Sequence, residues 1–332
     1  MAALAEGVRR GDARTLARAI TLVENETALG RALVGRLYAD SGGAFVLGVT
    51  GPPGAGKSTL VDQFVAHVRR LGLTVGVLAV DPTSPFTGGA ILGDRVRMSG
   101  HAADAGVFIR SMATRGQLGG LSRAAADAAV VLAASGKDIV VIETVGVGQD
   151  EIDVAQAADV TVVVLVPGTG DEVQAIKAGI MEVADVFVVN KADRADADRM
   201  VQAIEMNLSL HTYGEDDWRP PVVKTIATTA DGVEALWRSI VSFRERRGDG
   251  IDRRKRRGYA ARLRQLLADG FLRHVEAVLT PVRMEHVVDR IAAREIDAYA
   301  AAEEILREAI AGDTVAARAN VAAASPPPVK RG

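Results

Sequence analysis

The sequence of 332 residues contains no cysteine. This absence excludes thiol nucleophiles, disulfides, iron–sulfur ligation and cysteine-based zinc sites. Histidine is also scarce, and the five histidines are scattered at positions 67, 101, 211, 274 and 286. Because they do not cluster, the sequence predicts no site for a transition metal. Any chemistry must therefore use other groups.

The chain also lacks an excess of charge of either sign. Lys and Arg total 40 against 42 Asp and Glu, so nothing indicates a polyanionic partner such as DNA. No run approaches the roughly 20 apolar residues of a membrane span. Residues 1–10 mix Glu6 with Arg9 and Arg10, unlike a signal peptide. We expect a cytoplasmic protein whose partners include neither nucleic acid nor membrane.

What the chain does contain, from Phe45 onward, is a series of short runs rich in Val and Ile. They alternate with segments long enough to cross over a sheet, which is typical of parallel strands covered on both faces. The runs occupy residues 45–50, 74–80, 106–110, 138–143, 159–166, 184–190 and 222–226. The sequence therefore predicts a doubly wound α/β domain with a mostly parallel sheet.

Helical patterns flank this domain on both sides. Residues 1 to about 40 show helical periodicity with Asp12 as an N-cap, and residues 232–247 fit the last helix of the domain. Apolar stripes continue beyond Ile251, and either the main domain or a second subunit must cover them. The predicted organisation is an N-terminal helical extension at 1–43, an α/β domain at 44–247, a helical arm at 248–321 and a disordered Pro-rich tail at 322–332.

The strand at 45–50 leads directly into Gly-Pro-Pro-Gly-Ala-Gly-Lys-Ser-Thr, a Walker A motif at residues 51–59. Its glycines allow backbone N–H groups to surround a phosphate at the start of a helix. Lys57 would reach the β and γ phosphates, and the Ser58 hydroxyl would ligate Mg²⁺. A Gly-rich turn with a solvated lysine is the alternative, which the strand-then-helix context disfavours. The predicted nucleotide contacts are Gly51, Pro53, Gly54, Ala55, Gly56, Lys57, Ser58 and Thr59.

The run at 184–189 is followed by Asn190-Lys191-Ala192-Asp193, which resembles the guanine-specificity motif of GTPases. Asp193 could accept hydrogen bonds from N1–H and from the exocyclic amine of guanine, whereas adenine offers neither donor there. Asn190 would hold the loop, and the Lys191 stem would cover the base. A polar helix start is the alternative. We expect GTP over ATP and leave residues 225–229 unassigned.

Three carboxylates follow predicted strands or a Gly-rich segment. Asp81 could hold Mg²⁺ through its waters, and Asp94 could approach the γ phosphate and an attacking water, unless it is a helix cap or a surface residue. Glu143 stands where GTPases present Asp-x-x-Gly, so we expect it to contact Mg²⁺ through a water. Gly146 would place a backbone N–H at the γ phosphate. Gln149 could orient water, although a partner-dependent or structural role is favoured.

Taken together, the runs at 51–59, 80–94, 143–149 and 190–193 resemble the MeaB/ArgK family, the methylmalonyl-CoA mutase-associated G proteins. The resemblance covers roughly residues 10–310. It implies a homodimeric GTPase that binds an adenosylcobalamin-dependent acyl-CoA mutase, gates delivery of the cofactor and helps to expel damaged cofactor. The bound ligands would be GTP or GDP and Mg²⁺.

The resemblance also implies roles for individual residues by matching position. Lys57, Asp81, Asp94 and Glu143 would be the catalytic and metal-site residues. The segment at 168–179, with Gln174 and Lys177, would match the additional switch that couples nucleotide state to the mutase; a solvated helix start is the alternative. The helical region after residue 248 would correspond to the dimerisation arm.

Three other functions fit the sequence less well. A P-loop kinase of a small metabolite or amino acid would need an acceptor pocket, which no motif marks. A nickel or iron metallochaperone GTPase would need a cluster of metal ligands, which the scattered histidines do not provide. A signal-recognition-type GTPase would carry a Met-rich domain, whereas the seven Met are dispersed. The basic run at 253–257 is typical of a solvated or subunit-facing helix.

Overall fold

The computed structural model describes residues 1–82, 99–101, 103–114, 120–144, 157–168, 180–214, 217–246 and 249–323. The chain divides into two compact units, Met1–Lys255 and Arg256–Gly332. Across the described ranges, no helix combines the length and the apolar character needed to cross a membrane.

The first unit is built on a seven-stranded sheet in the order β3-β2-β4-β1-β5-β6-β7. Every neighbouring pair of strands is parallel, so each connection must cross a face of the sheet. The doubly wound α/β prediction is confirmed. The strands are β1 Phe45–Thr50, β2 Val75–Pro82, β3 Val107–Thr114, β4 Ile139–Thr144, β5 Val160–Leu165, β6 Val186–Asn190 and β7 Val222–Thr225.

Helices cover both faces of this sheet. Asp12 caps α2 as predicted, because its carboxylate accepts a hydrogen bond from the Thr15 N–H at 2.8 Å. Thr27 caps α3 through the Gly30 N–H at 2.9 Å. The helices are α1 Ala2–Arg9, α2 Ala13–Glu24, α3 Ala28–Leu37, η1 Tyr38–Gly43, α4 Lys57–Arg70, η2 Ser99–His101, α6 Gly120–Ala134, α9 Ile180–Val183, α10 Ala197–Ser209 and α11 Val233–Glu245.

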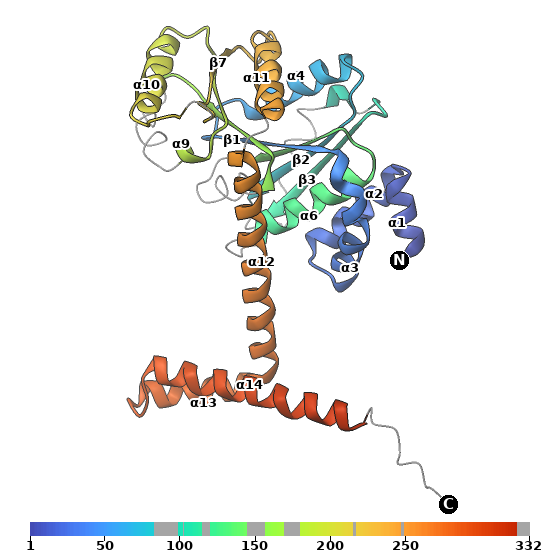
Figure 1. Cartoon of the computed structure of the whole chain (residues 1–332), viewed down its shortest axis with the longest axis vertical. Helices are drawn as coiled ribbons and strands as arrows, with labels where there is room; N and C mark the ends of the chain where they lie inside the picture. Colours follow the sequence, from blue (N-terminus) through green and yellow to red (C-terminus); the bar gives the residue numbers. More distant parts are fainter. Residues whose placement is uncertain are drawn as a thin grey trace, which may run out of the picture. The chain divides into compact units, whose positions relative to one another are not determined.

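Successive side chains of each strand point to opposite faces of the sheet, where they pack into hydrophobic layers with the covering helices. On β5, Val162 and Val164 pack into the layer shared with α4 and α11, whereas Val163 and Leu165 pack into a layer shared with α10. The helices α1, α2, α3 and α6 form a further layer against β2 and β4 (Figure 1). Burial on both faces explains why these strands are almost uniformly apolar in sequence. The central strand β1 is held between β4 and β5, which fixes the loop that follows it.

The second unit is helical. It contains most of α12 Asp249–Val278, together with α13 Pro281–Ala292 and α14 Ala298–Ala323. Arg283 and Arg290 both pair with Glu304 at 3.1 Å, which ties α13 to α14. The predicted disordered tail at 322–332 lies outside the described residues except for the last two residues of α14.

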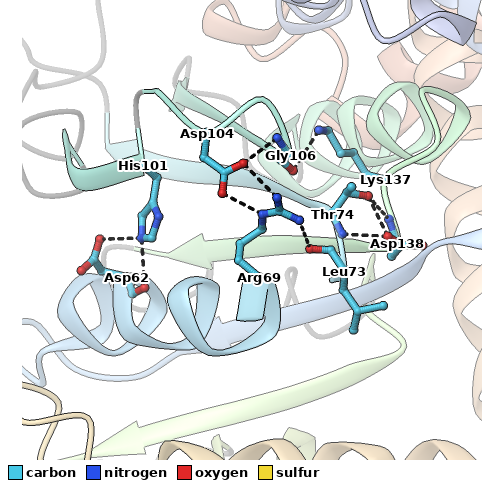
Figure 2. A network of polar contacts seen from close by, with 9 residues as sticks. All are labelled: Asp62, Arg69, Leu73, Thr74, His101, Asp104, Gly106, Lys137 and Asp138. Carbon is cyan, nitrogen blue, oxygen red and sulfur yellow. Dashed lines mark hydrogen bonds and ion pairs between the residues drawn. The ribbon is translucent and has the colours of Figure 1, made fainter. Parts of the chain in front are cut away.

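A polar network joins α4 to the amino ends of β2, β3 and β4 (Figure 2). Arg69 donates to both Asp104 oxygens, at 2.8 and 2.9 Å, and to the Leu73 carbonyl at 2.7 Å. Lys137 donates to the Gly106 carbonyl at 3.0 Å. The Arg69 guanidinium and the Gly106 N–H lower the pKa of Asp104 to about 2. A forked ion pair of this kind fixes geometry more firmly than a single hydrogen bond.

This network predicts a pH-dependent loss of stability in Asp104→Asn. Because the folded-state pKa is depressed, Asp104 stabilises the fold fully above its unfolded pKa of about 3.9. That contribution is lost as the pH falls toward about 2. We therefore expect the difference in unfolding free energy between wild type and variant to be largest at neutral pH and to shrink below about pH 4. Denaturant titrations at several pH values measure it.

The control is Asp198→Asn, which removes an ion pair to Lys224 of the same 2.8 Å length. Both of those side chains are more than half exposed, so their pair contributes little. A loss in Asp104→Asn that is no greater than in the control, or that does not change with pH, would contradict the prediction.

Candidate functional site

The loop at residues 51–59 lies between the end of β1 and the start of α4, at the carboxyl edge of the sheet. Two of its glycines are required by space as well as by backbone angle. Gly51 has φ of 140°, and a Cβ there would collide with the Val164 carbonyl of β5. Gly56 has φ of 85°, and a Cβ there would collide with the Asn190 side-chain amide. The loop therefore keeps a shape that only glycine permits at these two points.

The Lys57 side chain turns back across residues 51–59, the candidate phosphate cradle. Lys57 is only 5% exposed, and its Nζ donates to the carbonyls of Gly51 at 2.7 Å and Pro52 at 3.0 Å. The same residue begins α4, whose first N–H groups have no intrahelical acceptor and carry the positive end of the helix dipole. A buried cation beside the N–H groups at a helix start favours a phosphate group.

The other loop residues predicted to contact the nucleotide are partly buried within the loop and partly exposed to solvent. Ala55 is fully buried, and its N–H donates to the Pro52 carbonyl at 3.2 Å. Pro53, Gly54 and Thr59 are exposed and lie at the rim. The cradle therefore has a fixed floor and an open side toward solvent.

Two oxygen ligands suitable for Mg²⁺ meet beside the cradle. The Ser58 hydroxyl donates to Glu143 Oε1 at 2.6 Å, and Glu143, the residue before the last of β4, has only 4% of its surface exposed. Hydroxyl and carboxylate oxygens are the hard donors that Mg²⁺ prefers, so this pair fits the ion. Binding would require the Ser58 hydroxyl to turn its lone pair toward the metal.

Two further carboxylates were predicted for this site. Asp81 follows Val80 on β2, and Val80 pairs with Thr144, the neighbour of Glu143. The backbone of Asp81 is thus placed at the correct edge, while its side chain is not among those described. Asp94 lies outside the described residues, as do Gly146, Gln149, Gln174 and Lys177.

The predicted guanine motif is attached to the phosphate loop. Asn190 ends β6 and is 1% exposed, and its amide donates to the Ala55 carbonyl at 2.9 Å. Lys191 has a positive φ of 57°, and its Nζ donates to the Gly54 carbonyl at 2.9 Å. The motif and the loop are therefore held in one rigid arrangement. Asp193 is exposed, which leaves its carboxylate accessible to a ligand.

A third segment joins the site, and its contacts were not predicted. Asn190 Oδ1 accepts hydrogen bonds from Thr225 Oγ1 and from the Ala227 N–H, both at 3.1 Å. Asn190 thereby bridges the phosphate loop to the turn after β7. A backbone N–H carries one of these contacts, so no side-chain pattern at Ala227 could have signalled it. The only signal available was the position of residues 225–229 at the end of the strand predicted at 222–226.

Known proteins resemble this chain over most of its length. The family model described as methylmalonyl Co-A mutase-associated GTPase MeaB matches residues 16–279. A protein of Pyrococcus abyssi that is named as a GTPase is 48% identical over 313 residues, covering 93% of this chain and 97% of the relative. GTPase ArgK of Escherichia coli is 42% identical over 253 residues, covering 73% of this chain and 76% of its own.

Two other similarities extend the comparison. The mouse protein named methylmalonic aciduria type A homolog, mitochondrial, is 38% identical over 254 residues, covering 71% of this chain and 61% of the mouse protein. Among solved structures, one titled LAO/AO transport system kinase superposes with a TM-score of 0.68 and 29% identity. It covers 92% of this chain and 95% of its own.

Proposed function

This chain belongs to the family of methylmalonyl Co-A mutase-associated GTPases, MeaB, and from that membership we propose that it hydrolyses GTP to GDP and phosphate as a partner of an adenosylcobalamin-dependent acyl-CoA mutase. The observation that carries the proposal is the bridge made by Asn190, because it holds a base-reading motif, a phosphate cradle and the turn after β7 together. A kinase of a small metabolite is less favoured, since the family and two of the relatives are described as GTPases.

The proposed roles follow from position. Lys57 and the N–H groups at the start of α4 stabilise the charge that develops on the phosphates as the bond to the γ phosphorus breaks. Mg²⁺, when bound, would neutralise charge shared by the β and γ phosphates. Its predicted ligands, direct or through water, are Ser58, Asp81, Asp94 and Glu143. Asp193 selects guanine, and Lys191 keeps the base site in register with the loop.

Asp94 and Gly146 are proposed to face the γ phosphate, as the family resemblance implies. Gln149, Gln174 and Lys177 are proposed to change position with the nucleotide and to contact the mutase. Because catalysis here is mostly positioning, turnover can be slow until the partner completes the site. A chaperone role, in cofactor loading and in protection of the mutase, would follow from two nucleotide-dependent states with different affinities for the mutase.

We also propose that the helical arm at 248–321 forms a homodimer in the cytoplasm. Among the described residues, most large apolar side chains that are exposed lie in the second unit; examples are Leu263, Leu267, Phe271, Val282, Val288 and Tyr299. A concentration of this kind on helices is typical of a surface that a second protein covers. A second copy of the chain carries the same exposed apolar side chains, so two copies can bury these surfaces against each other.

Light scattering combined with turnover assays tests both partner proposals. The chain alone should have twice its mass of 34.8 kDa. Adding methylmalonyl-CoA mutase should give a larger complex and should change GTP turnover. The control is a mutase that does not use adenosylcobalamin. If neither methylmalonyl- nor isobutyryl-CoA mutase binds or alters the rate, the chaperone role is wrong and the GTPase role stands. A monomeric mass would remove the dimer.

A further inference from the structure

The segment that leads into β3 is attached to the phosphate-binding helix at two points (Figure 2). One is the forked Arg69–Asp104 pair in the last turn of α4. The other joins His101, in η2, to Asp62 on the same helix. His101 Nε2 lies 3.2 Å from Asp62 Oδ1 and 3.2 Å from the Asp62 backbone carbonyl.

The two attachments differ in strength. Arg69 and Asp104 share two hydrogen bonds of 2.8 and 2.9 Å, and Asp104 also accepts from the Gly106 N–H at 2.8 Å. The His101 contact is longer, and one ring N–H is shared between two acceptors. The Arg69–Asp104 attachment therefore holds the segment more firmly, beside the last turn of α4. The His101 contact is weaker and sets the position of η2 beside Asp62, nearer the start of α4.

Their distances from the phosphate site differ as well. Asp62 follows Ser58 by one helical turn, about 6 Å along the axis, whereas Arg69 lies about 16 Å beyond Ser58. The Asp62 and His101 side chains are 23% and 13% exposed, so the contact is shielded from water on most sides. A shielded contact one turn from the Mg²⁺-binding hydroxyl can hold the first turn of α4 against the segment before β3.

We propose that Asp62 and His101 form a positioning pair for GTP hydrolysis. The pair holds the first turns of α4, with Lys57 and Ser58, in register with the chain that enters β3. This inference rests on the proposed GTPase function and assigns it two residues that no motif marks. Neither residue is proposed to touch the nucleotide.

Without the pair, we expect the rate of GTP hydrolysis to fall while the affinity for the nucleotide stays nearly unchanged. The backbone N–H groups of the loop remain in place without the pair, so nucleotide affinity should change by less than about twofold. A small displacement of Ser58 relative to the other groups matters more in the transition state, where misplacement of about 1 Å can cost up to about 100-fold. A loss of kcat without a change in KM is the signature of an interaction used only there.

The test compares His101→Ala, Asp62→Ala, the double variant and His101→Gln in the full chain. We expect a fall in kcat of about 10- to 100-fold in each alanine variant, with the GTP dissociation constant nearly unchanged. The double variant should be no slower than either single one, because the two residues act as a unit. His101→Gln, which keeps an N–H donor of similar reach, should recover most of the rate.

Asp104→Asn is the matched control, because it weakens the other attachment of the same segment. It should lower stability and leave kcat within about twofold of wild type. Thermal unfolding of each variant shows whether the alanine variants fold, and His101→Gln tests the pair if they do not. Alanine variants that keep wild-type kcat, or that lose affinity as much as rate, would overturn the pair. A wild type that fails to hydrolyse GTP even with methylmalonyl-CoA mutase present would instead refute the GTPase function itself.

Discussion

Replacing Lys57 by Ala is expected to lower GTP turnover by about 100- to 1000-fold, because it removes the buried cation predicted to contact the β and γ phosphates. In the unsubstituted protein, the Lys57 amine lies 2.7 Å from the Gly51 carbonyl and 3.0 Å from the Pro52 carbonyl, so it occupies the interior of the loop. No water molecule can supply the same fixed charge there. Phosphate release under saturating GTP and Mg²⁺ measures the loss.

The control for this variant is Lys224→Ala, which removes an exposed lysine paired with Asp198. That change should leave turnover within about twofold of wild type, since surface ion pairs contribute little. Circular dichroism checks that Lys57→Ala keeps the fold. Normal turnover in a folded Lys57→Ala protein would contradict the assignment of this loop to the phosphates.

Asp193→Asn changes which base the protein binds. The carboxylate of Asp193 is predicted to accept from N1–H and from the exocyclic amine of guanine, and an asparagine amide can accept only one of these. Its NH₂ group instead matches the C2 carbonyl of xanthine. We expect affinity for GTP to fall at least about 100-fold and affinity for xanthosine triphosphate to rise. Competition binding with the three nucleotides, ATP included, measures the change.

Asp196→Asn is the matched control, since Asp196 is also exposed, lies three residues further along and makes no side-chain cap bond to α10. Its nucleotide preference should equal that of wild type. If Asp193→Asn still prefers GTP to xanthosine triphosphate by the wild-type factor, another residue reads the base.

The strands were predictable because parallel strands buried on both faces need almost uninterrupted apolar residues. The predicted runs fall within two residues of the observed bounds for most strands. The exception is β3, predicted to end at residue 110 and observed to reach Thr114. Arg110 and Ser111 interrupt the apolar run there, while the backbone continues to pair with β2. Side-chain periodicity cannot show a register that backbone hydrogen bonds determine.

The site was predictable to the extent that its chemistry resides in side chains. The predicted Lys57, Ser58, Glu143, Asn190 and Lys191 do lie together in the structure. The contacts of Asn190 with Thr225 and the Ala227 N–H were not foreseen, because a backbone donor has no residue signature.

The network around Arg69 was likewise out of reach of the sequence. Arg69 and Asp104 are 35 residues apart, and each is an ordinary surface residue type. Only the strand order brings the segment before β3 to the end of α4. Pairs of this kind depend on topology, so they become visible only when the chain is folded.

The central claim is that residues 51–59 hold the phosphates of a nucleotide whose guanine is selected at Asp193, and calorimetric titration of GDP and ADP in the presence of Mg²⁺ tests it most directly. We predict saturable heat for GDP with one site per chain and an affinity for ADP at least about 100-fold weaker. No heat with guanosine nucleotides, or equal affinity for both bases, would contradict the account.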